Sequence, residues 1–155
     1  MSYFFIFTVG YLLHFPAISI GVLVHEIGHG LIAFFLTKDD VKVNIGLGAS
    51  RKKLCIGRFF IDFSNFPWSQ GKTECNVYGV TIIRRLLILI AGSFFNLIQI
   101  FLSIYFITIS NLPIRCIVLA WLLANIRVVI GSLNKNHRSE INDLERIKNI
   151  LVKCF

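Results

Sequence analysis

The chain is poor in charged residues. Only 15% of its 155 residues are Asp, Glu, Lys or Arg, whereas 55% are hydrophobic, and the mean hydropathy is +0.73. Soluble domains are typically about 25% charged and about 45–50% apolar. The shortage of charge excludes an intrinsically disordered chain and argues against a soluble globule, because a domain of this size has too little interior to hide so much apolar material. The composition therefore predicts a single-domain integral membrane protein.

The cysteines show no regular spacing. The cysteines at positions 55, 75, 116 and 154 form no C-x-x-C pair and no regular framework, which argues against a disulfide scaffold or a zinc knuckle.

The charge balance is basic. The chain has eight acidic residues and 16 Lys and Arg, which gives a net charge of +8. A basic balance is compatible with nucleic-acid binding. Here the basic residues lie in loops beside apolar stretches, as the positive-inside rule requires, and we expect no nucleic-acid partner.

Three apolar stretches, at about residues 4–36, 82–109 and 113–133, are predicted to be transmembrane helices. About 20 residues cross a bilayer core, so the first stretch exceeds one straight span. Either it forms one long helix kinked near Pro16, or Phe4–Leu13 is a separate short helix. It starts without the basic residues of a signal peptide, so we expect it to be retained.

Positive charge predicts how these spans are oriented. Lys and Arg concentrate in the loop 37–81, at the start of the second span and in the tail 134–155, whereas the turn between the second and third spans holds none before Arg115. With three spans, the loop and the tail share one side, which the positive-inside rule makes the cytoplasm. We therefore expect a multi-pass protein of the cell membrane in contact with the lipid bilayer.

The segments outside the spans carry two further patterns. Val41–Ile45 alternates apolar and polar residues, and Cys55–Phe63 is rich in β-branched and aromatic ones, which predicts a small β-hairpin against the membrane face. Phe66–Gly71 is expected to be an interfacial loop. Asn142–Glu145 has the N-x-x-E pattern of a capping box and predicts a short C-terminal amphipathic helix. The predicted fold class is an all-α polytopic membrane protein with these two additions.

The first span contains an H-E-x-x-H motif, formed by His25, Glu26 and His29. Residues four apart lie on one face of a helix, so the two imidazoles can bind one zinc ion. Glu26 can then deprotonate a water molecule that zinc activates. A polar patch facing the bundle interior is the alternative, but two histidines and a carboxylate in one turn are costly in hydrocarbon and usually mark a functional site.

A catalytic zinc ion usually has a third protein ligand. The candidates on the predicted cytoplasmic side are His137, Glu140 and Asp143. Asp143 reaches the metal if the tail folds back, but it is equally suited to the N-terminus of a helix, where the macrodipole favours a carboxylate.

The chain resembles the site-2 protease family of intramembrane zinc metalloproteases. The resemblance rests on His25–His29 (HEIGH), on Ala91–Asn96 (AGSFFN), close to the family's Ala-Gly-Pro-x-x-Asn, and on Asn125–Asn134 followed by Asn142-Asp143. Ser93 stands where the family commonly has proline, and Leu144 where it has glycine. The resemblance implies that His25, His29 and Asp143 hold Zn²⁺, and that Glu26 is the general base.

Two asparagines in the predicted spans have two interpretations each. Asn96, and with less support Asn125, either donates a hydrogen bond to the oxyanion of the reaction or makes an interhelical hydrogen bond. Gly92 and Ser93 are expected to permit close helix packing.

Two functions follow as hypotheses. The first is a zinc-dependent intramembrane endopeptidase acting on membrane-associated proteins or precursor peptides. An edge of Val41–Ile45 or Cys55–Phe63 would bind the extended substrate by strand addition, unless the hairpin merely covers the membrane face. The second is a non-proteolytic binding or regulatory protein of the same fold. The intact motif favours the enzyme, because a non-catalytic chain has no need of Glu26.

Overall fold

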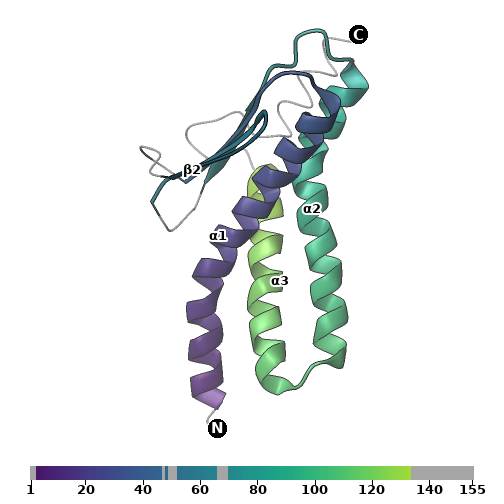
Figure 1. Ribbon diagram of the computed structural model, residues 1–155. Helices are drawn as coiled ribbons and strands as arrows, with labels where there is room; N and C mark the ends of the chain where they lie inside the picture. Colours follow the sequence, from purple (N-terminus) through teal and green to yellow (C-terminus); the bar gives the residue numbers. More distant parts are fainter. Residues whose placement is uncertain (1–2, 47, 49–51, 66–69, 134–155) are drawn as a thin grey trace.

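Three long helices and a small sheet make up the described part of the chain. The computed structural model describes residues 3–46, 48, 52–65 and 70–133. The helices are α1 (Tyr3–Leu36), α2 (Ile82–Ile109) and α3 (Leu112–Leu133), and the sheet is inserted between α1 and α2 (Figure 1). All three helices are long and apolar enough to cross a membrane. The predicted apolar helices are confirmed, with ends that differ by at most one residue. The predicted C-terminal helix lies outside the described residues.

Helix α1 runs without interruption through Pro16, so Phe4–Leu13 is not a separate helix. Proline removes one backbone donor, but the helix packs against α3 on both sides of this position. Before Pro16, His14 Nδ1 lies 3.4 Å from the carbonyl of Ala120, and after it a Cβ added at Gly21 would lie 3.2 Å from Val128 Cγ2. These contacts support the helix across the missing hydrogen bond.

Apart from Ile88, the residues that α2 and α3 bury are small or polar, and many of their large apolar side chains are exposed. The buried residues of α2 and α3 are Ile88, Ala91, Gly92, Asn96, Ser103, Ala120, Ala124 and Asn125. By contrast, Phe94 and Phe101 of α2 are exposed over 55% and 71% of their surface. Small interhelical residues with an apolar exterior are typical of helices surrounded by lipid.

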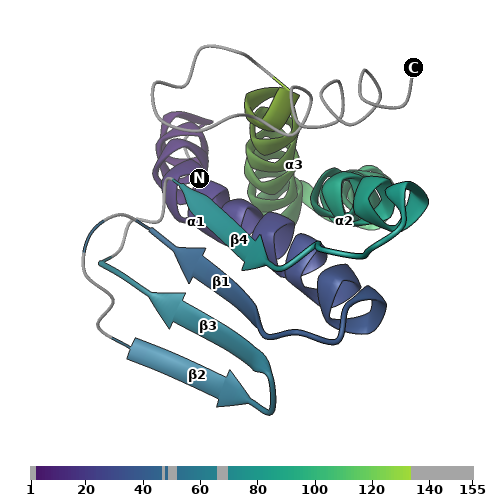
Figure 2. The same cartoon turned by 90° about the horizontal axis from the view of Figure 1, so that it is seen from above.

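The loop 37–81 forms a four-stranded mixed sheet instead of the predicted hairpin. Its strands are β1 (Val41–Ile45), β2 (Lys52–Ile56), β3 (Phe59–Phe63) and β4 (Gly71–Cys75), in the order β2-β3-β1-β4. Strands β1 and β3 are parallel, and the other neighbours are antiparallel. Figure 2 shows the sheet on one side of α1, with β4 nearest the helices and β2 farthest from them.

Two sequence predictions in this loop were wrong. Cys55–Phe63 is not one strand, because Gly57, at φ +60°, forms a turn that separates β2 from β3. The segment GKTEC, which forms β4, was not predicted as a strand, and its first residue, Gly71, was predicted to lie in a loop. This segment lacks the apolar alternation of a half-buried strand.

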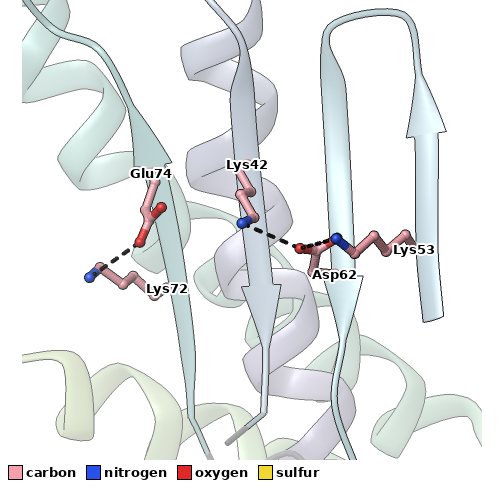
Figure 3. A network of polar contacts seen from close by, with 5 residues as sticks. All are labelled: Lys42, Lys53, Asp62, Lys72 and Glu74. Atoms are coloured by element: carbon pink, nitrogen blue, oxygen red, sulfur yellow. Dashed lines mark ion pairs between the residues drawn. The ribbon is translucent and has the colours of Figure 1, made fainter. Parts of the chain in front are cut away.

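The two faces of the sheet differ in chemistry. Val43, Ile45 and Ile61 are buried on the inner face, against Leu23 and Ile27 of α1. The outer face is charged: Asp62 lies 3.4 Å from Lys42 and 4.0 Å from Lys53, and Lys72 lies 3.3 Å from Glu74 (Figure 3). The alternation predicted for Val41–Ile45 is therefore confirmed, and it directs the apolar face of the sheet at α1.

Arg58, in the turn before β3, fastens the sheet to the end of α1. Its guanidinium donates to the carbonyls of Thr37 and Phe34, each at 2.6 Å, and lies 4.5 Å from the centre of the Phe34 ring. Carbonyls at a helix C-terminus have no intrahelical partner and carry partial negative charge, so a cation is favoured there.

We expect Arg58→Met to weaken this attachment, because methionine keeps an apolar stem but donates nothing. The loss should be about 1–2 kcal/mol, or about 2–8 °C in Tm at this chain length, measured by thermal unfolding in detergent micelles. Lys53→Met is the control, since Lys53 is exposed and lies 4.0 Å from Asp62, which keeps Lys42 as its closer partner. Equal losses for the two variants would contradict the capping role.

Candidate metal centre

The three residues of the H-E-x-x-H motif lie in the C-terminal half of α1 and are enclosed by other elements. His25, Glu26 and His29 expose 5%, 9% and 6% of their surfaces. Helix α2 packs against His29, and strand β4 packs against Glu26. The motif is therefore in the protein interior rather than on the outer surface of the helix.

The imidazoles of His25 and His29 converge as the four-residue spacing predicts. Their Nε2 atoms lie 3.2 Å apart, and the rings are nearly perpendicular, with an interplanar angle of 87° and centroids 4.7 Å apart. Two nitrogens bound to one tetrahedral zinc at about 2.0–2.1 Å lie about 3.3–3.4 Å from each other. The observed separation is close to this value, so the two side chains fit a zinc ion.

A backbone carbonyl of α2 fixes the orientation of His29. Its Nδ1 donates to the carbonyl of Ile88 at 2.6 Å. The proton on Nδ1 leaves the lone pair on Nε2, which is the nitrogen that faces His25. Metal-binding histidines usually have such a partner, which sets both tautomer and ring orientation.

Gly92 allows α2 to come this close. A Cβ added at Gly92 would overlap His29 Nε2, and would lie 2.6 Å from His29 Cδ2 and 2.8 Å from the carbonyl of His25. Close packing at Gly92 was expected from the sequence. The structure shows that the surface it packs against is the histidine pair itself.

Strand β4 contacts the Glu26 side chain and main chain. The Thr73 hydroxyl lies 2.9 Å from Glu26 Oε2 and 3.0 Å from the Glu26 carbonyl oxygen, and the backbone of Gly71 packs against the Glu26 side chain. Thr73 and Gly71 were not predicted as site residues, because the sequence of β4 does not predict a strand. The only available signal was a glycine and a threonine two residues apart, which by itself identifies nothing.

No third metal ligand is found in the part of the chain that the structure describes: no group of three or more His, Cys, Asp or Glu is placed to hold a metal there. Asp143, and the alternatives Glu140 and His137, lie outside the described residues. A third ligand from the tail stays a prediction.

Asn96 and Asn125 are fully buried beside Gly21, which lies one helical turn before His25 in α1. Asn96 Nδ2 donates to the carbonyl of Gly21 at 3.3 Å, which is the interhelical bond considered as one interpretation. Asn125 Nδ2 donates within α3, to the carbonyl of Trp121 at 2.9 Å. Within the described residues, neither Oδ1 atom has a hydrogen-bond partner. A role of either asparagine at an oxyanion stays a prediction.

We expect Gly92→Ala to lower zinc affinity about tenfold or more, because the added methyl group displaces the His29 ring from its Ile88 contact. Zinc retained by the purified protein against a competing chelator would measure this. Gly131→Ala on α3 is the matched control, since a Cβ there meets no atom of the described residues within 4 Å. Unchanged zinc affinity in Gly92→Ala would show that zinc binding does not depend on the contact between α2 and His29.

Comparison with known proteins gives no independent assignment. No protein-family model matches the chain, and no curated protein matches it. The case for a metal centre therefore rests on the convergence of His25 and His29 and on the Ile88 carbonyl that orients His29.

Proposed function

We propose that this chain is a zinc-dependent intramembrane endopeptidase that hydrolyses peptide bonds of membrane-associated proteins or precursor peptides, as its resemblance to the site-2 protease family implies. The observation that carries the proposal is the 3.2 Å separation of the two Nε2 atoms. Glu26 follows directly on His25 and is buried with both histidines. Two metal-binding imidazoles beside a carboxylate are the parts required for metal-assisted hydrolysis.

His25 and His29 would hold the zinc ion through Nε2, and we propose Asp143 as the third ligand. Gly10 packs near Cys116 and Gly21 near Val128, so α1 and α3 run parallel. Leu133, five residues after Val128, therefore ends α3 at about the level of the motif. Ser132 also lies 3.2 Å from Ser93, the residue after Gly92. Ten residues of chain reach at most about 33–36 Å, so a tether from Leu133 allows Asp143 to bind the metal.

In the proposed reaction, Glu26 takes a proton from the attacking water and delivers it to the leaving amine. The water oxygen forms a bond to the scissile carbonyl carbon and the C–N bond breaks. The proton passes to the leaving nitrogen, which departs as an amine. Zinc, when bound, supplies a Lewis acid that polarises the carbonyl and makes water a nucleophile near neutral pH. Burial of Glu26 and both histidines strengthens these electrostatic interactions, because little water is present to screen them.

We place the protein in the cell membrane, with the three helices spanning it and the site toward the cytoplasm. His29 and His25 lie 7 and 11 residues before Leu36, the end of α1, which corresponds to about 10–16 Å along the helix. The basic residues of the loop 37–81 and of the tail 134–155 favour the cytoplasm for this end.

Substrate would bind to the outer edge of β4. The sequence predicted an edge at Val41–Ile45 or Cys55–Phe63. Val41–Ile45 is β1 and Phe59–Phe63 is β3, and each pairs with strands on both sides, whereas Cys55 and Ile56 lie in the edge strand β2. Strands β2 and β4 end the sheet, and β4 is the one that contacts Glu26. An extended segment added to β4 would therefore lie beside the proposed base.

Replacing the base tests the enzymatic proposal. In vesicles containing a library of single-span membrane segments, with cleavage read by mass spectrometry, Glu26→Gln should lower turnover by about 10²–10⁴-fold. Its zinc content should match that of the unmodified protein, whereas His25→Ala should lose zinc. Asp40→Asn is the control, because this carboxylate is exposed between α1 and β1, outside the proposed site. Cleavage unaffected by Glu26→Gln would refute the mechanism, and a zinc-loaded wild type that cleaves nothing would favour the non-proteolytic alternative.

Photo-crosslinking tests the proposed substrate edge. A benzophenone side chain replacing Glu74 on β4, in the Glu26→Gln background that keeps substrate intact, should crosslink to the single-span segments. The same group replacing Lys53 on β2 should not, because β2 is at the far end of the sheet (Figure 2). Crosslinks at Lys53 but not at Glu74 would assign substrate binding to β2 and would contradict the proposed edge.

A further inference from the structure

The Thr73 side chain makes the contact between β4 and Glu26. Its hydroxyl carries one proton and faces two acceptors of Glu26, Oε2 at 2.9 Å and the main-chain oxygen at 3.0 Å. The hydroxyl thus lies against both the carboxylate and the backbone of the same residue. Rotation of the Glu26 side chain away from β4 would break the contact with Oε2.

Gly71, two residues earlier on the same face of β4, restricts Glu26 further. A Cβ added at Gly71 would overlap Glu26 Cγ and would lie 2.9 Å from Cδ and 3.1 Å from Oε1. The Glu26 side chain is therefore confined between the Gly71 backbone and the Thr73 hydroxyl. This confinement leaves the carboxylate little rotational freedom.

The main chain of the same two residues faces the outer edge of the sheet. Gly46 N donates to the carbonyl of Gln70 at 2.8 Å, and the register pairs Ile45 with Gly71 and Val43 with Thr73. Hydrogen-bonded and non-hydrogen-bonded pairs alternate in an antiparallel ladder. The Gly46–Gln70 pair is hydrogen-bonded, so the pairs that contain Gly71 and Thr73 are not. Their N–H and C=O groups consequently point away from β1, toward the edge proposed for substrate.

We propose that Thr73 is a positioning residue, which fixes the Glu26 carboxylate for proton transfer and ties it to the strand that receives the substrate. This inference rests on the proposed endopeptidase function. A general base must lie within hydrogen-bond reach of the proton that it takes, and a displacement of about 1 Å can cost about 10²-fold in rate. The Thr73 side chain contacts Glu26, and the Thr73 main chain is part of the edge proposed for substrate. One residue therefore sets the positions of the carboxylate and of the substrate backbone.

Thr73→Val and Thr73→Ser separate the hydroxyl from the shape of the side chain. Valine keeps the branched shape but cannot donate, so kcat on single-span segments in vesicles should fall about 10–100-fold, with KM within about twofold and zinc content unchanged. Serine keeps the donor and should restore most of kcat. Normal kcat in Thr73→Val, or equal damage by both substitutions, would overturn the inference.

Thermal unfolding gives a second readout that needs no catalysis. Thr73→Val, Glu26→Ala and the double variant of the full chain are compared in micelles. If the hydroxyl contacts the carboxylate, Thr73→Val should lower Tm less in the Glu26→Ala background than in the wild type, because that contact is already absent. Losses in Tm that add in full would overturn the inference whatever the activity.

The two proposals fail differently. If Glu26→Gln abolishes cleavage while Thr73→Val leaves kcat intact, the role of Thr73 is wrong and the endopeptidase proposal stands. If the zinc-loaded wild type cleaves none of the segments, both proposals are overturned, even where the Tm data show the contact.

Discussion

Burying two imidazoles and a carboxylate on one helix turn is the constraint on which the rest of the structure depends. An unpaired buried polar group costs several kcal/mol in an apolar environment, and α1 is apolar on both sides of His25, Glu26 and His29. The motif needs partners from outside its own helix. The carbonyl of Ile88 supplies one for His29, and the Thr73 hydroxyl supplies one for Glu26. Helix α2 and strand β4 must therefore both touch α1 at this level, which fixes the helix packing and the position of the sheet.

The close approach of these two elements depends on glycine at each contact. Gly92 faces the histidines and Gly71 faces Glu26, and a Cβ at either position would overlap the side chain opposite. The remainder of the loop 37–81 supports β4 in this position. Strand β1 packs its apolar face on α1 and pairs with β4, while Arg58 fastens the other side of the sheet to the end of the helix. The sheet thus acts as a scaffold that brings a short polar strand against a buried carboxylate.

This arrangement explains which parts were predictable from sequence. The helices were, because apolar runs of more than 20 residues have few alternative structures, and β1 was, because Val41, Val43 and Ile45 alternate with polar residues. Strand β4 was not, because its inner face meets Glu26 as well as the apolar core, and so carries Gly71 and Thr73 instead of large apolar residues. Departures from a local pattern are expected at functional sites. The motif predicted the histidine pair, but the partners of His29 and Glu26, which are Ile88 and Thr73, lie 59 and 47 residues away in the chain and follow from the fold alone.

The same geometry bears on how a membrane-embedded substrate would be cleaved by the proposed enzyme. A transmembrane helix satisfies its own amides, and each backbone group released in lipid without a partner costs several kcal/mol. A substrate helix can therefore unwind only where other groups form hydrogen bonds with its released backbone amides and carbonyls. The outward main-chain groups of Gly71 and Thr73 would be such partners, and the same two residues contact Glu26 through the Gly71 backbone and the Thr73 hydroxyl. An unwound segment would then be stabilised by strand pairing at the place where the proposed base acts, so binding energy from the substrate backbone would also present the scissile bond.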